Sequence, residues 1–197
     1  MAMKYEIVVI GTSLGGLAAL ETLFADLPRD FSLPIAVVQH RGVLSTESLS
    51  VTLRRHTSLR VRETQDKEEI LPGHIYMAPP DYHLMVEPGA FALSTEAPVL
   101  YARPSIDVLF ESAADAYAER VIGVVLTGAS QDGAEGAACI KARGGCVIAE
   151  APETAVSPVM PAAAIAATKV DWILPLPEIG PMLAALIGTK VCIPKRK

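Results

Sequence analysis

The sequence predicts an α/β fold: a doubly wound, mainly parallel sheet with helices on both faces and a small antiparallel β-hairpin. Three observations predict it. Short, nearly all-apolar runs rich in β-branched residues recur along the chain, as expected of strands that are buried on both faces. Segments with helical spacing of apolar residues follow several of these runs, and this alternation is typical of a parallel sheet. Between residues 59 and 94 the runs are shorter and are separated by turn residues, which predicts the hairpin.

The first part of the chain predicts two strands joined by one helix. Residues 5–10 (YEIVVI) and 34–39 (PIAVVQ) are the apolar runs, and residues 17–27 carry apolar side chains at helical spacing. A glycine-rich turn at 11–16 joins the first strand to the helix, and Pro28 ends the helix.

The middle segment predicts four short strands, one hairpin and a helix. The strands are expected at 59–63, 74–77, 83–87 and 91–94. Glu87-Pro88-Gly89-Ala90 is a turn signal, so an antiparallel hairpin should lie beside the main sheet. Ser105 is a suitable N-cap for a helix over 106–117, because its hydroxyl can accept a hydrogen bond from the first helical turn.

The last part of the chain returns to alternating strands and helices. Strands are expected at 121–126, 146–148 and 172–174, and helices at 133–142 and 177–187. The sequence has no repeat, linker or low-complexity tract. Residues 1–197 are therefore expected to form a single domain, since single domains commonly reach about 200 residues.

Composition and charge exclude several classes of protein. The chain is 51% hydrophobic with a net charge of −5, and its basic run at 195–197 is short, so no nucleic-acid partner is expected. No apolar stretch reaches the ~18 residues of a membrane span, so no membrane insertion is expected. The three cysteines, Cys139, Cys146 and Cys192, lack CxxC spacing and indicate reduced thiols in a cytoplasmic protein.

The motif Gly11-Thr12-Ser13-Leu14-Gly15-Gly16 falls at the first predicted strand-to-helix turn. In G-x-S-x-G turns the glycines allow a tight backbone that exposes the serine hydroxyl, and nearby helix amides favour the charge of a tetrahedral intermediate. The alternative is a phosphate-binding turn. That turn requires glycine at position 13, and a dinucleotide site needs an acidic residue where the second strand ends in Gln39-His40. The motif therefore favours a serine hydrolase over a nucleotide-binding protein.

Candidate partners for Ser13 follow two other predicted strands. His40 lies at the carboxyl tip of the second strand, where open α/β sheets bind ligands, and an imidazole there is suited to act as a general base. A packing or surface role is the alternative for a lone histidine. Asp132 lies just past the strand at 121–126 and could orient the imidazole or cap the helix that follows. On residue type and position alone, Asp81 and Asp107 compete with it.

Several blocks in one order resemble the catalytic domain of the chemotaxis protein-glutamate methylesterases (CheB type). The resemblance runs from Val9 to about Leu176, and its blocks are IGTSLGG (10–16), VVQH (37–40), LPGHIYMAP (71–79), DYH (81–83), RPSIDVLF (103–110), IGVVLTG (122–128), DGAEG (132–136) and MPAAAI (160–165). It implies a triad of Ser13, His40 and Asp132, with an oxyanion held by backbone N–H groups near Leu14 and Ala129. It implies no metal or organic cofactor. Four residues lie in family-like blocks and either line a substrate groove or have capping and structural roles: His83, Arg103, Ser105 and Asp107.

The chain departs from the family pattern beside each member of this implied triad. The family commonly has threonine after the nucleophile, Met-Pro after the histidine and Met-Gly after LTG. This chain has Leu14, Arg41-Gly42 and Ala129-Ser130 at those places. Ala129 can still supply a backbone amide to the oxyanion. We therefore expect the triad to be retained and the substrate groove around it to differ.

The resemblance implies hydrolysis of γ-glutamyl methyl esters on the cytoplasmic helices of a chemoreceptor, with release of methanol, and deamidation of certain glutamines. The alternatives are an esterase or amidase with another substrate, and a catalytically weak adaptor on the same fold. Family members usually carry an N-terminal phosphoacceptor receiver domain, and this chain starts four residues before its first strand. We therefore expect Ser13 to be constitutively accessible, with a receiver or other signalling protein acting in trans as a further candidate partner.

Overall fold

The computed structural model describes residues 4–40 and 49–188. Arg41, Gly42, Cys192 and the basic run at 195–197 lie outside the described residues. Within the described part, seven parallel strands form one sheet in the order β3-β4-β2-β1-β7-β8-β9. They are β1 (Ile7–Thr12), β2 (Ile35–Gln39), β3 (Arg60–Glu63), β4 (His74–Met77), β7 (Val121–Val125), β8 (Cys146–Glu150) and β9 (Trp172–Leu174).

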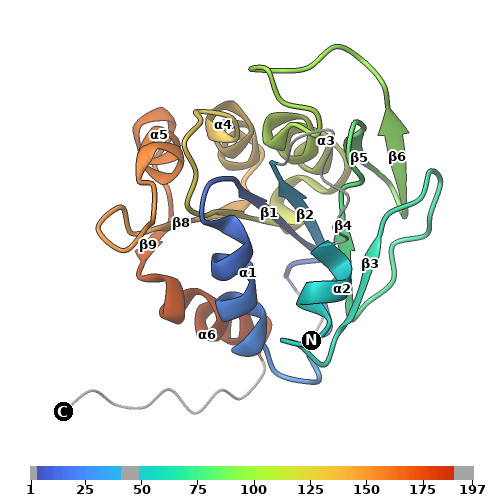
Figure 1. Ribbon diagram of the computed structural model, residues 1–197, viewed down its shortest axis with the longest axis horizontal. Helices are drawn as coiled ribbons and strands as arrows, with labels where there is room; N and C mark the ends of the chain where they lie inside the picture. The colour runs from blue at the N-terminus through green and yellow to red at the C-terminus, as the bar shows by residue number, and fades with distance from the viewer. Residues whose placement is uncertain (1–3, 41–48, 189–197) are drawn as a thin grey trace.

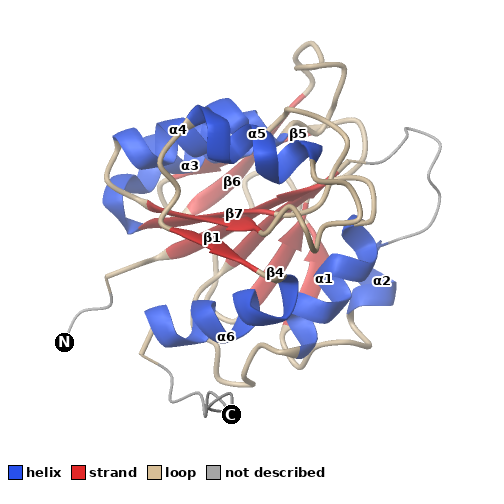
Figure 2. Cartoon of the chain, turned by 90° about the vertical axis from the view of Figure 1, so that its left-hand side faces the viewer, coloured by secondary structure: helices blue, strands red, loops and turns tan. Residues whose placement is uncertain are grey.

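Helices cover both faces of this sheet (Figures 1 and 2). Their bounds are α1 (Gly16–Ala25), α2 (Leu49–Leu53), α3 (Ile106–Tyr117), α4 (Ala134–Ala142), α5 (Val159–Ala167) and α6 (Leu176–Leu186), and a 3-10 turn, η1 (Ala118–Arg120), joins α3 to β7. α1, α2 and α6 lie on one face of the sheet, and α3, α4 and α5 lie on the other (Figure 2). The doubly wound fold expected from the sequence is confirmed.

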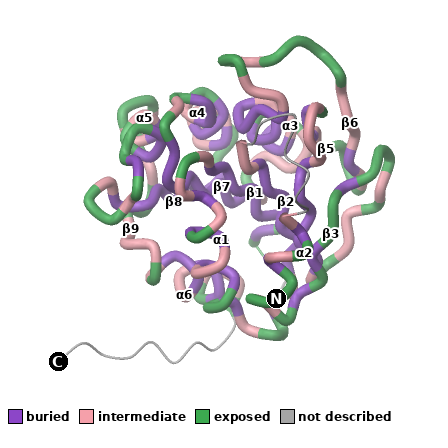
Figure 3. The backbone as a smooth tube through the Cα atoms, viewed as in Figure 1, coloured by how far each residue is buried: buried purple, intermediate pink, exposed green. Residues whose placement is uncertain are grey.

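The central strand β1 shows why its apolar run is unbroken. All six of its residues are buried, because helices cover both faces of the strand. Val8 and Ile10 pack into the core against α1 and α6, while Ile7 and Val9 pack into the core against α3 and α4. Figure 3 shows the same contrast over the chain: the central strands are buried, and exposed residues are concentrated on loops.

A separate antiparallel hairpin lies beside the main sheet, as the sequence predicts. Its strands are β5 (His83–Glu87) and β6 (Ala90–Ser94), and Gly89 in the turn between them has a φ of 81°. The hairpin packs on α3, where Ser112 Oγ accepts a hydrogen bond from the Val86 N–H. The other two short strands of this segment, β3 and β4, belong instead to the main parallel sheet.

Two helices, α2 and α5, are absent from the sequence-based prediction. α2 has only five residues, and α5 is almost uniformly apolar and rich in alanine. Neither segment therefore shows the contrast between a polar and an apolar face on which helical periodicity depends.

The neighbouring strands β2, β1 and β7 end at one edge of the sheet. Thr12 pairs with Gln39 and Gly11 pairs with Val125, so the three carboxyl ends lie at nearly the same level. β2 and β7 flank β1 on opposite sides, and in open α/β sheets such a reversal of strand order leaves a crevice where ligands bind. The loops that carry Ser13, His40 and Asp132 all begin at this edge.

Candidate active site

Ser13 lies in the tight turn between β1 and α1. Gly15 has a φ of 81°, and the Gly16 N–H donates a hydrogen bond to the Ser13 carbonyl. A Cβ at position 16 would lie 2.1 Å from Gln39 Oε1 and 2.4 Å from the buried Thr12 Oγ1, so a larger residue there would displace both side chains. Ser13 is partly exposed and lines a surface hollow together with Leu14 and His40. The glycines of the motif thus allow the serine to reach the surface beside the end of β2.

Hydrogen bonds to backbone carbonyls connect the loops after β1, β2 and β7. The Ser13 N–H donates to the Thr127 carbonyl (3.0 Å), and the Thr127 hydroxyl donates to the Leu14 carbonyl (2.9 Å). On the other side, the His40 N–H donates to the Thr12 carbonyl (2.9 Å). The three loops therefore form one connected unit around Ser13.

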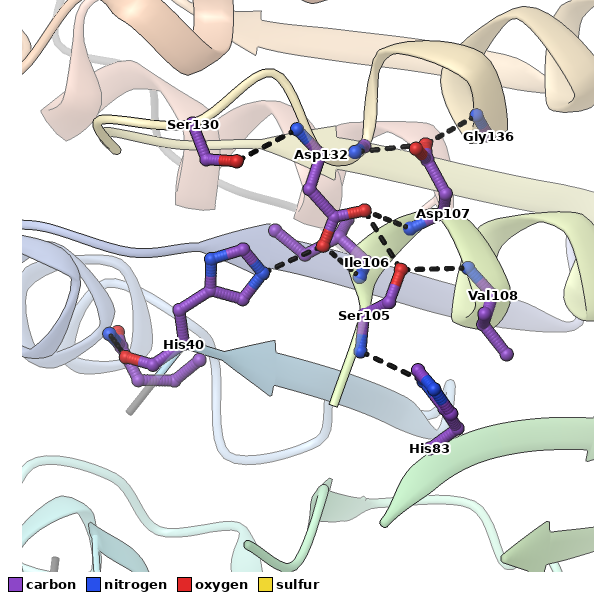
Figure 4. A network of polar contacts seen from close by, with 11 residues as sticks. His40, His83, Ser105, Ile106, Asp107, Val108, Ser130, Asp132 and Gly136 are labelled. Atoms are coloured by element: carbon purple, nitrogen blue, oxygen red, sulfur yellow. Dashed lines mark hydrogen bonds and ion pairs between the residues drawn. The ribbon is translucent and has the colours of Figure 1, made fainter. Parts of the chain in front are cut away.

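His40 and Asp132 are in direct contact (Figure 4). His40 Nε2 lies 2.7 Å from Asp132 Oδ2, and the Asp132 side chain is fully buried. Asp132 also accepts hydrogen bonds from the Ser105 hydroxyl and from the N–H groups of Ile106 and Asp107. Burial alone would raise the pKa of Asp132, but these four donors outweigh it and lower the pKa. The carboxylate is therefore held ionised, and Nε2–H of His40 donates to it.

The position of Asp132 also bears on its alternative role as a helix cap. Its oxygens bind the first turn of α3, not the first turn of α4, which follows it in the chain. Asp107 instead accepts the Gly133 and Gly136 N–H groups at the start of α4 (2.9 and 2.7 Å). Burial, with the nearby charge of Asp132, raises the pKa of Asp107 to about 7. Asp81, the remaining competitor, is paired with Arg103.

The four residues assigned to a groove or a structural role differ in exposure. His83, Ser105 and Asp107 are buried. The Ser105 N–H donates to His83 Nδ1, so His83 Nε2 carries the proton and donates to the Ala97 carbonyl. Arg103 is the exception, because it lines a hollow of about 530 Å³ together with His40. The first three therefore support the loops of the site from beneath.

Backbone amides suited to hold an oxyanion lie on the two loops beside Ser13. In the described part of the chain, the N–H groups of Leu14 and Ala129 donate no hydrogen bond. Ala129 follows Gly128, where an added Cβ would lie 2.9 Å from Ser13 Cβ. The chain after β8 holds this loop in place: the Gly128 N–H donates to the Ser157 carbonyl, and the Met160 N–H donates to the Gly128 carbonyl.

Comparison with known proteins identifies the family. A model described as CheB methylesterase matches residues 8–183. The chain belongs to the CheB methylesterase family. Its fold matches the crystal structure of the Thermotoga maritima CheB methylesterase catalytic domain with a TM-score of 0.88 and 39% identity, over 93% of this chain and 99% of that one.

Relatives of this CheB-family chain have two lengths. A protein from Leptospira interrogans is 43% identical and is matched over 93% of this chain and 96% of its own length. Proteins from Thermotoga maritima and Caulobacter vibrioides, both named protein-glutamate methylesterase/protein-glutamine glutaminase, are 38% and 42% identical. This chain spans about half of their length, 55% and 53% respectively.

One residue of the CheB-family site, Gln39, is absent from the sequence-based prediction. Its Nε2 donates to the carbonyls of Ser13 (2.8 Å) and His40 (2.9 Å), while its Oε1 is buried without a partner among the described residues. The amide thus bridges the backbones of the implied nucleophile and base. The sequence signal that could have identified Gln39 is an amide side chain at the last position of a buried strand, directly before His40.

Residues 4–40 and 49–188 contain no group of three or more His, Cys, Asp or Glu side chains placed to hold a metal ion. None of their helices is both long and apolar enough to cross a membrane.

Proposed function

We propose that this chain hydrolyses γ-glutamyl methyl esters on the cytoplasmic helices of a chemoreceptor, releasing methanol, and that it deamidates glutamines at the same site. The observation that carries the proposal is the 2.7 Å contact between His40 and the ionised Asp132, beside the exposed turn of Ser13. Relatives named protein-glutamate methylesterase/protein-glutamine glutaminase support the choice of substrate. The proposal includes action in the cytoplasm, where such a substrate lies.

In this proposal Ser13 is the nucleophile and His40 is the general base. Since Nε2 of His40 donates to Asp132, Nδ1 is the ring nitrogen left to accept the Ser13 hydroxyl proton. Ser13 Oγ attacks the ester carbonyl, and the imidazolium then protonates the leaving methoxide to give methanol. A water molecule, deprotonated by the same imidazole, hydrolyses the acyl-enzyme and restores Ser13. With a glutamine side chain the leaving group is ammonia.

Asp132 and the backbone amides stabilise the charges that develop during this reaction. The buried carboxylate of Asp132 stabilises the imidazolium and fixes the ring orientation, and three other donors hold it in place. The N–H groups of Leu14 and Ala129 are assigned to the oxyanion. The start of α1 at Gly16 adds the positive end of a helix dipole near the same point.

The test is methanol release from a chemoreceptor cytoplasmic fragment carrying isotopically labelled methyl esters. The wild-type chain should release labelled methanol, and the Ser13→Ala variant should not. Deamidation is followed by mass spectrometry on the fragment with glutamine at the same sites. Hydrolysis of a blocked glutamate γ-methyl ester without release from the receptor would indicate another esterase. Absence of both activities would indicate a catalytically silent adaptor.

A further inference from the structure

A two-residue turn protrudes from the loop between β6 and α3. Val99 and Ala102 close it by exchanging two backbone hydrogen bonds of 3.1 and 2.8 Å. The residues at its tip, Leu100 and Tyr101, have positive φ values of 47° and 64°. Two successive positive φ values favour Asn and Gly, because a large side chain crowds the backbone in this conformation. Leu and Tyr are therefore poor choices for forming the turn.

The two side chains at the tip are exposed to solvent. Leu100 is 53% exposed, and Tyr101 is fully exposed. The Tyr101 hydroxyl forms no hydrogen bond within the described residues, so the Tyr101 side chain makes no polar contact that stabilises the fold. Figure 3 shows this loop as one of the exposed segments of the chain. Backbone strain combined with exposed apolar side chains is characteristic of a binding element.

The loop that carries the tip is fixed to the body of the protein. The Arg103 guanidinium donates to the carbonyls of Thr95 and Glu96 and to the Asp81 carboxylate. His83 Nε2 donates to the Ala97 carbonyl of the same loop. Side chains from outside the loop and from its C-terminal end thus hold the base of the loop, and the tip is presented by a preorganised support.

The tip faces the candidate active site. Leu100 and Tyr101 line the hollow of about 530 Å³ that also contains His40. Two other exposed apolar side chains, Leu14 and Val156, lie on the Ser13 side of the site, where a Cβ on Gly15 would meet Val156 Cβ at 2.7 Å. Exposed apolar groups therefore lie on both sides of His40, which lines both hollows.

We propose that Leu100 and Tyr101 bind the protein substrate beside the esterified glutamate and determine its affinity. This inference rests on the proposed function. The partner is a helical receptor segment that presents apolar side chains next to the ester, so that the tip packs against it. A rigid, exposed tyrosine suits this role, because it offers a large contact area and loses little conformational entropy on binding.

The experiment compares two substrates with one double variant, Leu100→Asn/Tyr101→Gly. The substrates are the methylated receptor fragment and a blocked glutamate γ-methyl ester. The ratio of kcat/KM on the fragment to kcat/KM on the small ester should fall by about tenfold or more, through KM on the fragment. The melting temperature should stay the same or rise, because Asn and Gly suit the turn. The variant Ile173→Ala, which truncates an exposed residue on β9, is the control and should keep the wild-type ratio.

The outcomes separate this inference from the proposed function. An unchanged ratio in the double variant, with an active wild-type chain, overturns the inference alone. An equal loss on both substrates also overturns it, since the tip would then support the catalytic groups. A wild-type chain that releases no methanol from the receptor fragment overturns the proposed function and this inference with it.

Discussion

Asp132 binds the start of α3, the helix that contains Asp107, and Asp107 binds the start of α4, the helix that follows Asp132. Asp132 Oδ1 accepts the backbone N–H of Asp107 at 3.0 Å, and Asp107 Oδ1 accepts the N–H of Gly133, the residue after Asp132, at 2.9 Å. The positive ends of α3 and α4 therefore converge on two neighbouring carboxyl groups. Burial, with the nearby charge of Asp132, raises the pKa of Asp107, whereas hydrogen-bond donors outweigh burial at Asp132 and lower its pKa.

The raised pKa of Asp107 predicts a pH-dependent stability. The folded protein holds a proton on Asp107 up to about pH 7, while the unfolded chain releases it near the ordinary value of 3.8. The resulting stabilisation is complete below the unfolded pKa and is lost as the pH rises through about 7, with a magnitude on the order of 2–4 kcal/mol. Asp107→Asn keeps an acceptor for Gly133 and Gly136 but cannot ionise. Its melting temperature relative to wild type should therefore rise between about pH 5 and about pH 8.

The difference between variant and wild type cancels titrating groups that do not interact with Asp107, and Asp132, whose pKa is lowered, is already ionised in this pH range. The exposed variant Asp115→Asn is a control, and its difference from wild type should stay flat over the same range. A flat difference for Asp107→Asn would contradict the assignment of a raised pKa to this group.

Asp132→Asn should reduce both turnover and stability. Each carboxylate oxygen of Asp132 accepts two hydrogen bonds: Oδ2 from His40 and the Ile106 N–H, and Oδ1 from the Ser105 hydroxyl and the Asp107 N–H. Asparagine replaces one of these oxygens with an NH₂ group, which cannot accept hydrogen bonds from the donors that face it. We expect kcat to fall roughly 10²- to 10⁴-fold, with KM nearly unchanged. The unpaired buried donor should also cost about 1–3 kcal/mol of unfolding free energy. Steady-state kinetics and thermal denaturation measure the two effects, and wild-type kcat in this variant would exclude Asp132 from the reaction.

Ser13→Ala should abolish hydrolysis without destabilising the fold. The Ser13 hydroxyl forms no hydrogen bond within the described residues, so its removal breaks no structural contact. The expected loss of kcat is on the order of 10⁴- to 10⁶-fold. Methanol release and circular dichroism should be measured on the same sample. A folded variant that retains activity would rule out a serine mechanism.

Gln39→Met tests whether the amide bridge positions the site. Methionine has a similar length but cannot donate to the Ser13 and His40 carbonyls. A displacement of the nucleophile or base should lower kcat by up to about 10²-fold, with little change in KM. Gln65→Met, an exposed substitution, is the matched control. Equal kcat values in the two variants would show that the bridge has no positioning role.

Much of the arrangement could be predicted from the sequence because parallel strands bring their carboxyl ends to one edge. Ser13 and His40 directly follow buried strands, and Asp132 lies in the loop after another. Their places in the sequence therefore predict that the three residues are neighbours. The strand bounds of β4, β5 and β9 and the bounds of α3 also agree with the structure, since their patterns end at clear turn or capping signals.

The exchange of caps between Asp107 and Asp132 could not be predicted, because it depends on how two helices pack across 25 residues of sequence. Capping rules based on sequence assign an aspartate to the helix nearest to it in the chain. Here the Asp132 carboxylate binds α3 and the Asp107 carboxylate binds α4. The turn at Leu100 and Tyr101 could not be predicted either. Neither residue favours a positive φ, so no turn signal is present at that point.

Ser157 and Met160 donate hydrogen bonds to the loop at Thr127 and Gly128, so cutting the chain between these two segments should disturb that loop. All residues assigned to the reaction lie before α4, yet the loop that presents Ala129 is shaped by segments that come after β8. A fragment ending in the exposed loop near Glu153 would contain the whole proposed triad but lack the segment that shapes the proposed oxyanion pocket. The two halves of a chain split there should each be inactive, and mixing them should restore hydrolysis only to the extent that they reassemble.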